Sequence, residues 1–184
     1  MKLATSLSLL AIASALSACG GGSAPLTKEQ IAGNHLGVIA HSNLDAPSTA
    51  IMPVNGTASY TGSFGIGSNL EPNAFAVGDA TVEADFAVGS MIGTAENFLY
   101  GIMDEEGVVA AEAYEGSLAL SGNFAGHQGL MTVTGTLEDA DVQGVLLTDF
   151  KGTSAQTLLG IGTGTIDATD VNMYLATFGG PQPY

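Results

Sequence analysis

The chain has 184 residues, 26 of them glycine and none tryptophan, and its formal net charge at pH 7 is −15. It has no arginine and three lysines, so it lacks the basic side chains that binding to nucleic acids or electrostatic docking on anionic lipid requires. The length corresponds to one domain, or a small domain with a tail, and suffices for a core without disulfides. The acidity suits a basic or cationic partner, or serves solubility alone.

Residues 1–18 have the features of a secretory signal peptide: Lys2 near the start, then an apolar stretch too short to span a membrane well. The stretch ends in Leu16-Ser17-Ala18-Cys19, which resembles the lipobox of bacterial lipoproteins. The resemblance implies cleavage before Cys19, the sole cysteine, and acylation of its thiol. Several acyl chains on one residue suffice for stable anchoring. The alternative is an ordinary signal peptide with an incidental cysteine.

Residues 19–34 are expected to form a lipidated tether, because they begin with a flexible Gly-Gly-Gly-Ser run. A barrel domain is expected over residues 35–184. Its first part contains a possible short strand at 35–41 and a loop at 42–55, where two prolines interrupt the chain.

Alternating apolar and polar residues then predict a series of half-buried strands. Residues 57–66 place Ala58, Tyr60, Gly62, Phe64 and Ile66 on one face, and a loop is expected at 67–78. The stretch 79–98 predicts a hairpin with a two-residue turn at Gly89-Ser90. Its inward residues are expected to be Ala80, Val82, Ala84, Phe86 and Val88.

Further strands are expected at residues 108–114, 117–124, 131–137, 142–151 and 157–166, with an edge strand at 171–178. Eight to ten short strands and no long helix favour an all-β fold, a single antiparallel barrel of about eight strands. Inward glycines at 62, 122 and 135 suit the tight bends of such a barrel. Outward rows of threonine and serine argue against a membrane-spanning barrel.

Five segments resemble the β-barrel domain of the transferrin-binding protein B-like family of bacterial surface lipoproteins. Gly56-Thr-Ala58-Ser-Tyr60-Thr-Gly62 is similar to its opening strand, and Asp85-Phe86 with Gly93-Thr94 to its next two. Residues 121–126 resemble its Ser-Gly-x-Phe-x-Gly step, and residues 150–160 its closing hairpin, with Gln156 in place of the family's Glu. The resemblance covers residues 56 to about 166. It implies a barrel and an outer-membrane, cell-surface lipoprotein. The chain departs from the two-lobed members, because it has room for one barrel and lacks their handle domains and long loops.

No catalytic constellation is evident, so we expect a protein that is not an enzyme and has no cofactor. His35, His41 and His127 could converge on a metal or haem, but a solvated histidine is the commoner situation. The acidic groups at 104–106 and 138–141 contain calcium-type ligands, yet neither matches an EF-hand, and solvated turns are more common.

The expected function is therefore binding: a lipid-anchored outer-membrane protein presenting its barrel loops to a host or environmental protein, or to an iron-bearing solute. The alternative is a structural envelope lipoprotein without a dedicated ligand. Long loops on a rigid scaffold often carry binding residues, which favours segments 42–55, 67–78 and 98–106. The candidate contact residues are Ile51, Met52, Leu70, Phe75, Phe98 and Tyr100.

Overall fold

The structure, a computed structural model, describes residues 48–49, 51–68, 70, 73–104 and 107–180. Its strands are β1 (Thr57–Ser68), β2 (Ala74–Asp85), β3 (Ser90–Asp104), β4 (Gly107–Tyr114), β5 (Gly116–Ala125), β6 (Gln128–Leu137), β7 (Ala140–Lys151), β8 (Thr157–Ile166) and β9 (Thr169–Gly179). Among these described residues, no helix is long and apolar enough to cross a membrane. The signal peptide, Cys19, the tether and the possible strand at 35–41 lie outside the described residues.

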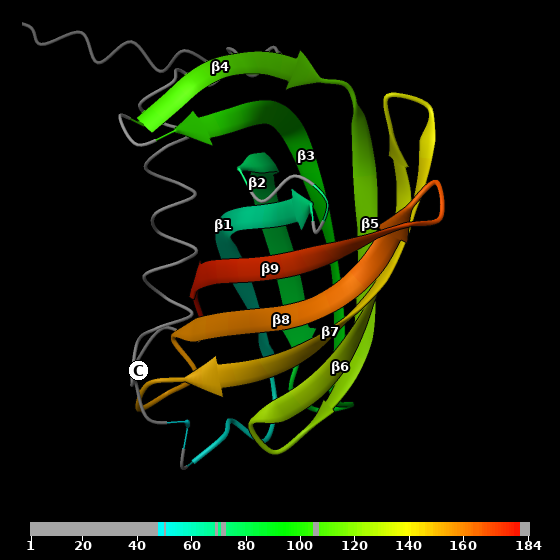
Figure 1. The fold of residues 1–184 in the computed structure, drawn as a ribbon. Helices are drawn as coiled ribbons and strands as arrows, with labels where there is room; N and C mark the ends of the chain where they lie inside the picture. Colours follow the sequence, from blue (N-terminus) through cyan, green and yellow to red (C-terminus); the bar gives the residue numbers. More distant parts are fainter. Residues whose placement is uncertain (1–47, 50, 69, 71–72, 105–106, 181–184) are drawn as a thin grey trace, which may run out of the picture.

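Eight of the strands close into an antiparallel barrel (Figure 1). The sheet order is β2-β1-β9-β8-β7-β6-β5-β3, and a further pairing of β2 with β3 completes the ring. The all-β, eight-stranded barrel predicted from the alternation is confirmed. Segment 171–178 was expected to lie at an edge, but β9 pairs with both β8 and β1. It is the strand that closes the barrel.

The inner face of the barrel follows the predicted period of two. In β1, Ala58, Tyr60, Phe64 and Ile66 are all buried, and in β2 the same holds for Ala80, Val82 and Ala84. Because successive side chains alternate between faces, these residues form one core with the inward residues of the other strands.

Two local predictions around β2 are wrong. The expected loop at 67–78 is shorter, because β2 already begins at Ala74. The turn before β3 spans residues 86–89 rather than two residues, and the Asp85 carboxylate accepts hydrogen bonds from the backbone N–H groups of Ala87 and Val88. The longer turn takes Val88 off the strand and leaves it 72% exposed, whereas Phe86 stays in the core.

Inward glycines allow neighbouring strands to approach closely. A Cβ atom on Gly62 would lie 2.0 Å from the carbonyl oxygen of Ala176 on β9, and one on Gly122 would lie 2.1 Å from that of Leu130 on β6. No real side chain tolerates such contacts with backbone. These positions therefore require glycine where the sheet curves.

Strand β4 stands outside the ring. The first half of β3 pairs with β5, whereas its second half, from Phe98 to Asp104, pairs with β4. In Figure 1, this second half and β4 bend across the upper end of the barrel. Among the described strands, β4 is the one with a ladder on one side alone, so it forms an edge above the barrel.

Candidate binding site at the upper end of the barrel

Four aromatic rings pack together in the core at the end where β7 finishes, which is the lower end in Figure 1. The Phe150 ring lies 4.9 Å from that of Phe124, 5.8 Å from that of Phe86 and 5.7 Å from that of Tyr60, between centroids. The Tyr60 hydroxyl donates a 2.7 Å hydrogen bond to the carbonyl oxygen of Ala155, and burial raises its pKa. These rings form an aromatic plug within the core at this end.

The chain also enters the described structure at the lower end. Ser48 forms a β-bridge with Lys151, and the Thr49 N–H donates to the carbonyl oxygen of Phe150. Asp149 joins the contact: its Oδ2 lies 2.7 Å from Nζ of Lys151 and accepts from the Ser48 hydroxyl at 2.9 Å. Its Oδ1 lies 2.7 Å from Nδ1 of His127. We call Ser48, His127, Asp149 and Lys151 the entry clamp.

The entry clamp predicts an acid-dependent contribution to stability. Burial raises the pKa of Asp149, but hydrogen bonds from Lys151, His127 and Ser48 and the Lys151 charge hold it below its ordinary value. We expect Asp149→Asn to lower the free energy of unfolding at pH 7 by about 1 kcal/mol, because the pair is partly exposed. The pKa of Asp149 is lower in the folded state than in the unfolded state, where it is about 4. The ionised carboxylate therefore stabilises the fold fully at pH values above about 4, and this stabilisation is lost as the pH falls through the folded-state pKa.

Urea denaturation of both proteins between neutral and acidic pH measures this difference. It should shrink as the pH falls below about 4, through the folded-state pKa of Asp149. Asp139→Asn, in an exposed turn, is the control and should match the parent protein. A constant difference at every pH would show that Asp149 acts through packing rather than through its charge.

The upper end, in contrast, contains a mostly apolar cavity of about 340 Å³. It lies between the β1–β2 region, the β3–β4 extension and the β8–β9 turn. Its lining consists of Ile66, Ser68, Ala74, Phe75, Ala76, Tyr100, Tyr114, Ile166, Asp167, Thr169 and Val171. A volume of this size lies at the small end of the range typical of ligand pockets.

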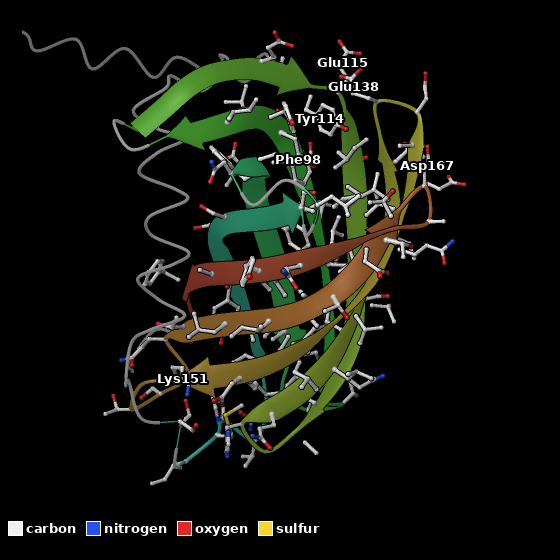
Figure 2. The ribbon with its side chains drawn as sticks, viewed as in Figure 1. Phe98, Tyr114, Glu115, Glu138, Lys151 and Asp167 are labelled. Atoms are coloured by element: carbon white, nitrogen blue, oxygen red, sulfur yellow. The ribbon has the colours of Figure 1, made fainter. Side chains whose placement is uncertain are left out.

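Aromatic residues form one side of this cavity. The rings of Tyr100 on β3 and Tyr114 on β4 lie 5.7 Å apart. Phe98 precedes them on the same face of the β3–β4 hairpin, but it is 2% exposed and packs edge-on against Phe64 at 6.3 Å. Phe98 therefore extends the core upward, and Tyr100 and Tyr114 lie above it at the cavity. Figure 2 labels Phe98 and Tyr114 at this end.

Two tight turns place carboxylates around the same end. Glu138 and Asp139 connect β6 to β7, Asp167 and Ala168 connect β8 to β9, and all four residues have positive φ angles, as two-residue hairpin turns of type I′ require. The Glu138 carboxylate accepts from the backbone N–H of Glu115 at 2.7 Å. The Asp167 carboxylate likewise accepts from the backbone N–H of Asp141 at 3.0 Å. Backbone hydrogen bonds thus hold two carboxylates at the rim.

The described lysine and the carboxylates of the upper rim lie at opposite ends of the barrel. Figure 2 shows Glu115, Glu138 and Asp167 at the upper end and Lys151 at the lower end. Lys151 is the one lysine in the described ranges, and it is paired with Asp149. The upper end is therefore uniformly acidic over the described residues.

The predicted contact residues separate into two groups. Phe75 and Tyr100 line the cavity, and Leu70, 78% exposed, follows β1 near it. Ile51, 80% exposed, and Met52, which packs on the core, lie in the segment that enters at the lower end. The three predicted segments thus do not form one surface, because 51–52 and 70–75 lie at opposite ends.

Phe98 needs a correction of its own. It was predicted to contact a partner, but its side chain is buried in the core and cannot reach one. Sequence reasoning also missed Tyr114, Ile166, Asp167 and Val171 of the cavity lining. The signal that could have identified them is connectivity, because in an up-and-down barrel the end of one strand and the start of the next meet at the same end.

The described residues contain no group of three His, Cys, Asp or Glu side chains placed to hold a metal ion. His127 lies in the entry clamp, while His35 and His41 lie outside the described residues. In the turn at 138–139, the Glu138 carboxylate accepts from the backbone N–H of Glu115. The geometry that stands out is a closed barrel with an apolar cavity and an acidic rim at one end, which is an architecture suited to binding.

Comparison with solved structures gives this barrel a known counterpart. The chain is similar to transferrin-binding protein B of Haemophilus parasuis, with a TM-score of 0.50, 15% identity, and coverage of 74% of this chain and 29% of that protein. This similarity confirms, at the level of the fold, the family resemblance of the sequence motifs. The chain spans less than a third of the Haemophilus parasuis protein.

Two other solved structures show weaker similarity. One is transferrin-binding protein B of Actinobacillus pleuropneumoniae, with a TM-score of 0.43, 17% identity, and coverage of 72% of this chain and 65% of that one. The other is described as a surface lipoprotein, with a TM-score of 0.45, 19% identity, and coverage of 72% and 64%. No family model matches the chain, and no curated protein matches it.

Proposed function

We propose that this protein is a lipid-anchored binding protein of the outer membrane, exposed at the cell surface, and that its upper barrel end contacts a protein partner. The observation that carries the proposal is the apolar, acid-rimmed cavity at the end opposite the entry clamp. A chain held at the membrane through its N-terminal side would approach the barrel from the lower end. The cavity would then face away from the membrane.

The structural counterpart supports a protein ligand. The Haemophilus parasuis protein is named for binding transferrin, and this chain has the same barrel fold at low identity. Transferrin is accordingly the first partner to test, both iron-loaded and iron-free, beside fluids and envelope extracts that contain unknown partners.

The anchoring half of the proposal predicts a loss of acylation in Cys19→Ser. Serine offers no thiol for the transferase, so the variant should remain unprocessed or poorly anchored. Incorporation of labelled palmitate, followed by membrane fractionation, measures the effect. Unchanged labelling in the variant would refute lipidation at Cys19.

The binding half predicts that a bulky residue at the cavity mouth weakens the contact. Thr169 lines the cavity on the exposed start of β9, so Thr169→Trp should obstruct the cavity with little effect on the core. We expect at least about a tenfold loss of affinity, comparable to the disruption of one interface hot spot. Surface plasmon resonance with the captured full-length protein measures it.

Thr134→Trp, on the exposed outer face of β6, is the matched control and should leave the affinity unchanged. If both variants bind equally well, the contact lies elsewhere on the barrel. If neither transferrin nor any protein from the fluids and extracts is retained by the parent protein, the binding function is refuted. The structural envelope lipoprotein then becomes the better explanation.

A further inference from the structure

We infer that the partner contributes an extended, basic polypeptide segment that adds to the free edge of β4 and covers the cavity with its apolar side chains. The inference rests on the proposed function and specifies the chemistry of the partner. It combines three independent features of the upper end: an edge strand, an aromatic-lined cavity and a rim of carboxylates.

The first feature is the edge itself. Every barrel strand has a neighbour on both sides, whereas β4 pairs with β3 alone among the described strands. An edge strand presents a row of backbone N–H and C=O groups that a further strand can pair with. Strand addition of this kind gives affinity through main-chain hydrogen bonds and specificity through pockets for alternate side chains.

The second feature is the position of the cavity relative to that edge. In the β3–β4 ladder Tyr100 is opposite Glu112 and Phe98 is opposite Tyr114, so these four residues share one face of the hairpin. Tyr100 and Tyr114 line the cavity. A strand added beside β4 would direct every second side chain toward the same face, and those side chains would reach the tyrosines and the cavity mouth.

The third feature is charge. Glu112 is exposed beside Tyr114, and Glu115, Glu138 and Asp167 surround the same end. The one described lysine, Lys151, lies at the opposite end. This field attracts a cationic segment and opposes a second copy of a chain whose net charge is −15. A basic strand is therefore favoured over pairing between two β4 edges.

The test uses the purified full-length protein in mild detergent and a fluorescent peptide of alternating lysine and valine, long enough for one strand. Anisotropy should show binding that weakens at least about tenfold as salt rises from about 50 mM to about 300 mM. Hydrogen–deuterium exchange should show new protection over residues 107–114. The same peptide with N-methyl groups on four consecutive central residues keeps its charge but cannot form the ladder, and should bind at least about tenfold more weakly.

Two triple variants separate this site from general acidity. Glu112→Gln with Glu115→Gln and Glu138→Gln removes three charges at the upper end and should weaken peptide binding at least about fivefold. Asp79→Asn with Glu83→Gln and Glu96→Gln removes three charges on the outer wall of β2 and β3. This control should bind within about twofold of the parent protein.

Several outcomes would overturn the inference. Equal binding of the N-methylated peptide would indicate a charge contact without strand addition, and equal binding of a glutamate–valine peptide would indicate an apolar contact alone. Protection of residues 107–114 that grows with protein concentration, without peptide, would indicate a second copy. If Thr169→Trp weakens binding of a protein partner while the lysine–valine peptide fails to bind, this inference is wrong and the proposed function stands.

Discussion

Replacing Phe150 with alanine is expected to lower the free energy of unfolding by about 3–5 kcal/mol, the usual range for a buried phenylalanine. Phe150 is fully buried, and its ring contacts those of Tyr60, Phe86 and Phe124. Its removal would leave a cavity at the centre of the aromatic plug, where the backbone of the closed barrel cannot collapse. Chemical denaturation followed by tyrosine fluorescence or circular dichroism measures the loss.

Leu147→Ala, on the same strand, is the control for this prediction. Leu147 is 71% exposed on the outer wall, so its truncation should change stability by no more than about 0.5 kcal/mol. Similar losses in the two variants would mean that the inward and outward faces of β7 have been assigned incorrectly. That result would also call the position of the plug into question.

The second large effect is expected from Gly62→Ala. The new Cβ would lie 2.0 Å from the Ala176 carbonyl oxygen and 2.7 Å from the Thr177 Cα. Both are backbone atoms, so no change of rotamer relieves the contact and β1 must separate from β9. We expect a loss of about 1–3 kcal/mol, as for overpacked cores. A lower thermal midpoint should accompany faster amide exchange along the β1–β9 ladder.

Gly67→Ala, on the same strand, is the control, because position 67 has room for a methyl group whereas position 62 does not. A Cβ on Gly67 would meet nothing within 4 Å, so this substitution should be neutral or stabilise by up to about 1 kcal/mol through the unfolded state. Equal destabilisation by both substitutions would show that β1 requires glycine for its own flexibility. Close approach of β9 would then not be the cause.

Strand alternation allowed much of the barrel to be predicted. The alternation predicts half-buried strands without any tertiary information. It assigns Tyr60 and Phe64 to the inner face of one strand and Leu118 and Leu120 to the inner face of another, and the structure buries all four. The path of the chain near Val88 was harder to predict, because the Asp85 side chain caps a longer turn that the local pattern does not distinguish from a two-residue one.

Only part of the candidate site could be predicted from the sequence, because both the exposure of a side chain and its neighbours depend on how the barrel closes. Phe75 was predicted as an apolar residue of the expected loop at 67–78, although it lies in β2, and Tyr100 as one of the few aromatic residues beside an acidic turn. Phe98 was selected on the same grounds, yet it lies in the core, because exposure depends on which face of the hairpin turns inward. Tyr114 and Ile166 join the cavity through closure of the ring, which depends on pairings between residues distant in sequence.

The entry clamp also determines how the molecule would carry mechanical load. A pull on the chain ahead of Ser48 reaches β7 before it reaches β1, through the Ser48–Asp149 hydrogen bond and the Thr49–Phe150 backbone bond. Phe150 passes the force into the aromatic plug, where its ring contacts those of Tyr60, Phe86 and Phe124. Tension on this part of the chain would thus be borne at the lower end, away from the cavity at the other end.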